Sequence, residues 1–236
     1  MLTWQTGRMP KSGSTILECE DFAAANPERG QFAVADGVTE SIGADRWAEL
    51  IANVFVKHPI PSPSEWPRYL DKVREAWWKD FRSLSLPWYA EHKLADGAAA
   101  TFVAVQIATT GTWSAIAVGD SVLLHQSADG ASRSFPISSA SEFSSVPEVV
   151  RSRAPINEPE LRCADGTWRP GDRFFLMTDA LAKFCIDTGG PREDRQCRTE
   201  LTDALISAVS WQERVSALRA NRLIRDDDVC FVSIRV

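Results

Sequence analysis

Several apolar runs of this 236-residue chain end or begin at an acidic residue, and this pattern limits the fold more than any other feature. Asp36 follows the run FAVA, Asp120 follows SAIAVG and Asp179 follows FFLMT. Asp227 and Asp228 lie just before the final run, VCFVSI, and the pair Glu20-Asp21 precedes FAAA. Short apolar runs bounded by glycine and turn residues are typical of buried strands. One aspartate at such a place is most often part of a turn, but the recurrence indicates strand ends that converge.

Converging carboxylates repel one another and raise one another's pKa unless a cation offsets their charge. Mg²⁺ and Mn²⁺ prefer oxygen ligands, and two such ions about 3.5–4 Å apart can polarise a water and hold a phosphoryl group. The chain has only 3 histidines, which are not clustered, so a histidine-rich metal site is not expected. The pattern therefore predicts a site for hard divalent cations, with a set of ordinary turns as the alternative.

The stretches between the strands show helical spacing. Apolar residues predict a helix within 40–58, and a proline-rich break leads to a second helix that we expect Ser64 to cap. Trp66, Trp77 and Trp78 are expected to pack this helix pair, and 192–220 returns to helical spacing with Val209 in its apolar stripe.

The order of elements suggests an α+β fold. Residues 127–160 are rich in Ser, Pro and Glu and are expected to hold loops with little regular structure, and the last nine residues predict a strand. A strand, two helices, several strands, further helices and a strand indicate antiparallel sheets flanked by helices on both faces. No linker separates domains, so residues 1–236 are expected to form a single domain.

Composition and charge exclude some partners. The formal net charge of −6 offers no broad basic field, so we expect no nucleic-acid partner. The 5 cysteines form no C-x-x-C pair, which argues against a zinc cluster or disulfide framework and fits a reducing cytoplasm. No stretch approaches the ~20 apolar residues of a membrane span, so we expect a cytoplasmic protein with no membrane partner. Cys19 and Cys230 are expected to be buried, and His125 to lie on the surface of a strand.

Six segments, in this order, resemble the metal-dependent type-2C serine/threonine protein phosphatases, the PPM-type family. The segments are CEDFAA, FAVADGVTESIGADRWA, DGAAATFVAVQI, AIAVGDSVLLH, RFFLMTDALAKF and RDDDVCFVSIRV. They are similar to the family's first acidic motif and to its VADG, GTTLVAAL, VNVGDSRAYL, LLLCSDGLTD and KDNITVVVVRI segments. The resemblance covers nearly the whole chain, and the opening SGSTILECED looks most like a bacterial branch.

The resemblance implies an αββα four-layer sandwich of two antiparallel sheets flanked by helix pairs. It also implies a centre of two Mn²⁺ or Mg²⁺ ions at one end of the sandwich and, as in many bacterial members, a third, weaker ion near Asp120. The metal ligands that it implies are Glu20, Asp21, Asp36, Gly37, Asp120, Asp179 and Asp227.

Each of these residues takes a role by resemblance. Asp36 would bridge both ions and form the catalytic core with Asp179 and Asp227, which hold the first ion. The Gly37 carbonyl and the pair Glu20-Asp21 would bind the second ion or its waters. A hydroxide bridging the ions would attack phosphorus in phosphoserine or phosphothreonine of a protein substrate, without a covalent enzyme intermediate. An opposing serine/threonine kinase is the implied partner.

The chain departs from the family pattern near the expected site. Ile16 occupies the position of the usual phosphate-binding Arg, which leaves Lys11 and Arg8 as candidates for substrate binding. Val38 replaces a His of many eukaryotic members, and Lys183 replaces an acidic ligand of the third ion. Two alternatives to an active phosphatase stay open: a weak or inactive pseudophosphatase that acts as a regulatory or binding module on the same fold, and an unrelated metallohydrolase on a different sandwich fold.

Overall fold

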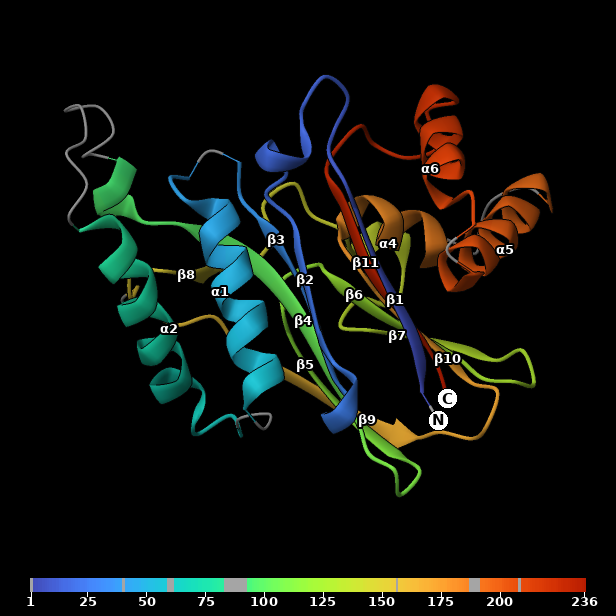
Figure 1. Ribbon diagram of the computed structural model, residues 1–236, viewed down its shortest axis with the longest axis horizontal. Coiled ribbons are helices and arrows are strands. Elements are labelled where there is room, and N and C mark those ends of the chain that lie inside the picture. The colour runs from blue at the N-terminus through green and yellow to red at the C-terminus, as the bar shows by residue number, and fades with distance from the viewer. Residues whose placement is uncertain are drawn as a thin grey trace.

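Two antiparallel sheets lie face to face with helices on both outer sides in this computed structural model (Figure 1). The structure describes residues 2–39, 41–58, 62–82, 93–155, 157–186, 192–207 and 209–236, without the side chains of 192–195 and 197. The α+β four-layer sandwich implied by the resemblance is confirmed.

The sheets divide the strands as follows. The first sheet has five strands in the order β1 (Thr3–Met9), β11 (Val229–Arg235), β10 (Arg173–Met177), β6 (Val122–Gln126) and β7 (Ser132–Phe135). The second has the order β2 (Phe22–Asn26), β3 (Gln31–Gly37), β4 (Ala99–Ile107), β5 (Thr112–Val118) and β9 (Arg162–Thr167), and the two-residue β8 (Val150–Arg151) pairs with β4.

Helices cover the outer face of each sheet (Figure 1). α1 (Ala44–Lys57) and α2 (Trp66–Phe81) share a hydrophobic cluster with the second sheet. α4 (Asp179–Ile186), α5 (Arg192–Ser207) and α6 (Trp211–Ala220) share another with the first sheet. A third cluster fills the space between the sheets.

The alternation of side chains along β3 decides which layer each residue joins, because successive residues of a strand point to opposite faces. Phe32 and Val34 belong to the cluster between the sheets, whereas Ala33 and Ala35 belong to the cluster under α1. Asp36 continues the alternation of Phe32 and Val34, so its carboxylate is directed between the sheets at the end of the strand.

Strand direction brings the acidic ends together. β3, β5 and β10 end at the same edge of the sandwich at which β2 and β11 begin, because neighbouring strands are antiparallel. Both chain termini lie at the opposite end (Figure 1).

The two predicted N-terminal helices are confirmed, with corrections in detail. α2 begins after Glu65 rather than at a cap formed by Ser64. The side chain of Glu65 accepts instead from the N–H and the hydroxyl of Ser62, at 3.2 and 2.9 Å. Trp66 and Trp77 are buried as expected, but Trp78 is 37% exposed and lies under the guanidinium of Arg153.

The C-terminal half shows further differences. The helical stretch 192–220 is two helices, and Val209 lies between them with 65% exposure, so its place in a buried stripe is wrong. Residues 127–160 hold only β7, β8 and a short 3-10 helix, Ala140–Glu142, among the residues that the structure describes there. β1, β9 and α4 are elements that the sequence patterns did not predict.

His125 is buried, which corrects its expected surface position. It lies on β6, stacks on Phe174 at a ring distance of 4.3 Å, and places Nε2 2.9 Å from Asp172 Oδ2. Cys19 and Cys230 are buried as expected. Within the described residues, no helix combines the length and the apolar character needed to cross a bilayer.

Candidate active site

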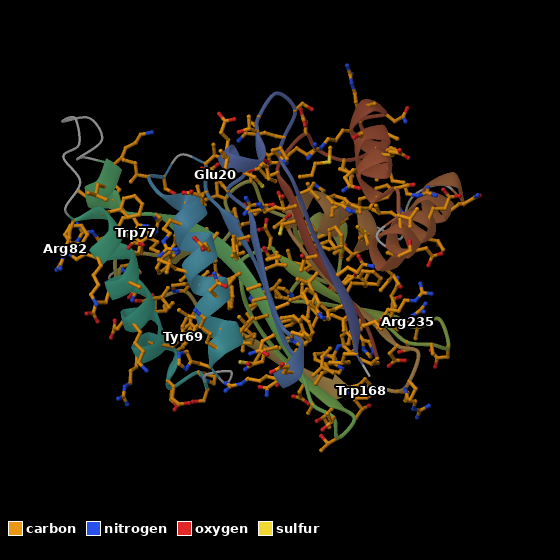
Figure 2. All side chains as sticks on the ribbon, viewed as in Figure 1. Glu20, Tyr69, Trp77, Arg82, Trp168 and Arg235 are labelled. Carbon is orange, nitrogen blue, oxygen red and sulfur yellow. The ribbon has the colours of Figure 1, made fainter. Side chains whose placement is uncertain are left out.

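The predicted acidic residues meet at one end of the sandwich, where Glu20 lies close to the ends of β3 and β11 (Figure 2). Asp36 ends β3, Asp120 follows β5 and Asp179 follows β10. Asp227 precedes β11, which lies beside β10 in the first sheet. The convergence predicted from strand ends is therefore present in the fold.

Asp21 and Asp36 lie side by side across β2 and β3. Phe22 pairs with Ala35, so the antiparallel register carried one residue further sets Asp21 opposite Asp36. Asp21 is only 2% exposed, and its Oδ2 atom has no hydrogen-bond partner among the described residues. A buried carboxylate oxygen without a partner is costly unless another group, such as a cation, takes that place.

The electrostatics of the site show how strongly the carboxylates oppose one another. Burial, followed by repulsion from Asp21, Asp179, Asp120 and Asp227, raises the pKa of Asp36 well above its ordinary value. Burial as the largest cause, followed by repulsion, is typical of like charges that are grouped where little water reaches them.

The neighbouring carboxylates respond in the same way. Burial raises the pKa of Asp21 well above its ordinary value, and repulsion from Asp228 and Asp179 adds to it, whereas the neighbouring side chains of Thr178 and Asp36 oppose the rise. Burial and the charge of Asp179 raise the pKa of Asp120 to about 6. Burial and Asp227 likewise raise the pKa of Asp179.

Arg225 supplies a positive charge at this cluster. Its Nε atom lies 3.2 Å from Asp227 Oδ2, and its Nη1 atom lies 3.9 Å from Asp179 Oδ2. The side chain of Arg225 is 73% exposed, whereas those of Asp179 and Asp227 are 25% exposed. A single exposed guanidinium therefore pairs with two of the predicted ligands.

Asp228 joins the segment before β2 to the start of β11. It has the same orientation as Cys230 and Val232, which face the space between the sheets. Its Oδ1 accepts from the Lys11 N–H and its Oδ2 from the Glu20 N–H, both at 2.8 Å. Asp228 thus fixes the backbone that carries Glu20 and Asp21.

Gly37 allows the backbone to pass close to the site. A Cβ atom at this position would lie 2.8 Å from the Glu20 carbonyl oxygen and 2.9 Å from that of Ala44. A side chain here would collide with the backbone before β2 and with the start of α1, so the close approach of these segments requires glycine.

The acidic side chains are of the chemical type that binds hard divalent cations, although in the described part of the chain their positions do not form a complete coordination sphere. Among the described residues, no three Asp, Glu, His or Cys side chains are arranged to hold one metal ion. The donors are all oxygen atoms, they are partly or fully buried, and one of them, Asp21 Oδ2, has no partner. These properties match what Mg²⁺ and Mn²⁺ select.

The candidates for substrate binding lie beside the site. Arg8 donates from Nη2 to the Ile16 carbonyl at 3.0 Å and lies over the ring of Phe22. The positive charge of Lys11 reaches Glu20 and opposes the rise in pKa that burial causes there. Ile16 itself is 48% exposed.

One residue of the site, Arg225, escaped the sequence patterns. It precedes Asp227 by two residues, and its charge next to an acidic run was the available signal. Asp228 belongs to the acidic pattern at the strand ends, and it lies two residues before the buried Cys230.

Comparisons with known proteins agree with this fold. The family model for protein phosphatase 2C matches residues 14–222. No curated protein matches the chain.

Several solved structures share the fold. The serine/threonine phosphatase PstP/Ppp of Mycobacterium tuberculosis has a TM-score of 0.67 at 17% identity, over 100% of this chain and 98% of that chain. The catalytic domain of PstP with two manganese ions has a TM-score of 0.65 at 17% identity, over 99% and 97%. PppA of Pseudomonas aeruginosa, described as a key regulatory component of T6SS, has a TM-score of 0.57 at 19% identity, over 99% and 97%.

At these sequence identities, the similarity to solved structures shows a shared fold only. Membership of the family rests on the family model, which matches most of the chain. An unrelated metallohydrolase on a different fold is thereby excluded. The chain belongs to the protein phosphatase 2C family.

Proposed function

We propose that this protein is a metal-dependent phosphatase that hydrolyses phosphoserine and phosphothreonine in protein substrates. The observation that supports it most is the meeting of Asp21, Asp36, Asp120, Asp179 and Asp227 at one end of the sandwich, where burial and mutual repulsion raise the pKa of Asp36. Such a cluster is costly in the absence of cations, and costly charge clusters are typical of functional sites.

The proposed ligands are those that the resemblance implies. Asp36, Asp179 and Asp227 would form the core of the site, with Glu20, Asp21 and the Gly37 carbonyl beside it and Asp120 at its edge. Two bound Mn²⁺ or Mg²⁺ ions would supply a polarised water and neutralise the charge of the phosphoryl group.

The chain's own residues hold this arrangement in place. Asp228 anchors the backbone of Glu20 through a 2.8 Å hydrogen bond. The Thr178 hydroxyl accepts from the Cys230 N–H at 3.0 Å, which joins the end of β10 to β11. The hydroxyls of Thr101 and Ser121 lie 2.6 Å apart and connect β4 to the segment that carries Asp120. Asp36 and Asp179 are thus supported by neighbouring strands.

The test is Mn²⁺-dependent hydrolysis of a phosphopeptide. We expect turnover by the natural chain, loss of turnover to the uncatalysed rate in Asp36→Asn, and no change in Asp71→Asn, whose side chain is 74% exposed on α2. Turnover equal in the natural chain and in Asp36→Asn, across several divalent metals, would refute the proposal.

A binding module without catalysis is the alternative function. Two observations favour it: Ile16 leaves the usual phosphate contact without charge, and Lys183 lies at the recess beside Asp179. Calorimetry separates the two functions, because two-site Mn²⁺ binding together with turnover rejects the binding module, whereas weak metal binding without turnover supports it.

Some further features belong to the proposal by resemblance. We propose a single domain over residues 1–236, a cytoplasmic location and an opposing serine/threonine kinase. A third ion near Asp120 and a phosphate contact from Lys11 are also predictions.

A further inference from the structure

A recess of about 590 Å³ adjoins the candidate metal site. Its lining includes the carboxylates of Asp120 and Asp179 and three basic residues, Lys183, Arg222 and Arg225. Positive and negative groups therefore face the same space. This combination suits a dianion that is bound by cations on both sides.

Arg225 is the basic residue that contacts the carboxylates. It pairs with Asp227 at 3.2 Å and with Asp179 at 3.9 Å. Its side chain is 73% exposed, and exposed ion pairs contribute little to stability because water screens them. The guanidinium can therefore leave both carboxylates at little cost when their charge is neutralised.

Arg8, the arginine that the sequence offers as a candidate for substrate binding, is held elsewhere. Arg8 donates to the Ile16 carbonyl at 3.0 Å and lies over Phe22. Ile16, at the position of the usual phosphate-binding residue, carries no charge. Lys183 lines the recess, but its Nζ atom lies 5.9 Å from the centre of the Phe143 ring, and within the described part of the chain no ion pair joins it to a predicted ligand.

We propose that Arg225 binds the phosphoryl group of the substrate in the recess, after divalent cations replace it at Asp179 and Asp227. This inference rests on the proposed function. A guanidinium presents two parallel N–H groups that match two oxygens of one phosphate, which favours Arg over Lys for this contact. Arg225 would thus pair with Asp179 and Asp227 in the metal-free protein and with the substrate phosphate in the metal-loaded protein.

We expect Arg225→Gln to change the affinities for Mn²⁺ and for phosphate in opposite directions. Removing a positive charge next to Asp179 and Asp227 lowers the repulsion felt by incoming cations, so Mn²⁺ binds several-fold more tightly to the variant. Removing the guanidinium also removes the phosphate contact, so inorganic phosphate binds the Mn²⁺-loaded variant about tenfold more weakly.

The experiment measures both quantities by calorimetry on the full chain. Mn²⁺ is titrated into the metal-free protein, and inorganic phosphate into the Mn²⁺-loaded protein. Arg225→Lys keeps the positive charge but lacks the two parallel N–H groups of the guanidinium. Its Mn²⁺ affinity should therefore stay near that of the natural chain, while its phosphate affinity falls. Arg214→Gln is the matched control, because Arg214 also pairs with a carboxylate, Glu200 at 2.7 Å, on the surface of α6.

Phosphate affinity unchanged in Arg225→Gln overturns the proposal, as does weaker Mn²⁺ binding in that variant. If a phosphopeptide is hydrolysed, we also expect a raised KM in Arg225→Gln. The two proposals fail separately: absence of turnover with a tenfold loss of phosphate binding refutes only the phosphatase function, and turnover with unchanged phosphate binding refutes only the role of Arg225.

Discussion

Three hydrogen bonds converge on the buried side chain of Asp172, which lies just before β10 at the end of the sandwich away from the candidate site. The Ala128 N–H donates to Oδ1 at 2.9 Å, the Arg169 N–H donates to Oδ2 at 3.1 Å, and His125 Nε2 lies 2.9 Å from Oδ2. Burial raises the pKa of Asp172, but these partners outweigh it and place the pKa below its ordinary value. The ionised carboxylate therefore stabilises the fold.

Asp172→Asn should lower the free energy of unfolding by about 1–3 kcal/mol at neutral pH, because an amide cannot accept from all of these donors. A carboxylate whose pKa is lowered by folding stabilises above the pKa of the unfolded chain and loses that effect as pH falls through the folded value. The difference between the two proteins should thus shrink as pH drops below the ordinary value of 3.8. Urea unfolding at several pH values measures it.

The control for this prediction is Asp129→Asn in the neighbouring turn. Asp129 is exposed and accepts one bond, from the Ala131 N–H at 3.1 Å, so the change should cost less than about 0.5 kcal/mol. A difference between Asp172→Asn and the natural chain that is the same at every pH would contradict the assigned role of the charge.

Single acidic residues at the site could be predicted from the sequence because their positions follow from strand alternation and strand ends. Asp36 is the case in point, since Phe32 and Val34 already indicate its orientation. Arg225 was missed because no periodicity constrains its exposed side chain, and its place beside an acidic run does not indicate which carboxylates it pairs with. His125 was misjudged because its partner, Asp172, is distant in sequence.

At the scale of elements, α1 packs closely on the second sheet. Ala33 and Ala35 on β3 present only methyl groups to it, so the helix approaches the strand closely. Trp47 on α1 is fully buried, and its Nε1–H donates to the Val150 carbonyl on β8 at 2.9 Å. One side chain thus joins the helix to the short strand at the edge of β4.

Trp47→Phe should reduce the free energy of unfolding by about 1–3 kcal/mol, because the buried Val150 carbonyl loses its donor and the smaller ring leaves space. Trp78→Phe on α2 is a matched control, since Trp78 is 37% exposed, and its effect should stay within about 0.5 kcal/mol. Thermal or urea unfolding compares the two. Equal effects of both changes would show that the Trp47 hydrogen bond contributes nothing.

Whether an element could be predicted depended on how much of it is buried. α1 and α2 each have one buried face, which gives a helical period of apolar residues. β1 and β9 lie at sheet edges and expose much of their length, so neither forms an apolar run. α4 is short and buried on nearly all sides, so it has no amphipathic period to distinguish it from the strand before it.

At the scale of the whole molecule, the first and last strands lie next to each other. β1 pairs with β11 along its full length, from Thr3 opposite Arg235 to Met9 opposite Val229. Asp228 extends this connection beyond the strands through its bonds to the Lys11 and Glu20 amides. The candidate site therefore depends on segments from both halves of the chain.

Asp228→Ala should lower the free energy of unfolding by about 2–4 kcal/mol, because two amides lose a charged acceptor. Asp228→Asn keeps one acceptor oxygen, so it should cost less and leave one of the two amides protected. Hydrogen exchange at Lys11 and Glu20 measures this directly. Protection of both amides in Asp228→Ala that equals the natural chain would contradict the assigned connection.

The position of β11 has a consequence for the newly made protein. β11 lies between β1 and β10 in its sheet, so β1 has its strand partner there only once β11 has been synthesised. Asp227 and Asp228 are synthesised immediately before β11. Translation order thus separates the synthesis of Glu20, Asp21 and Asp36 from that of Asp227, and the acidic cluster can assemble only after β11 has been made.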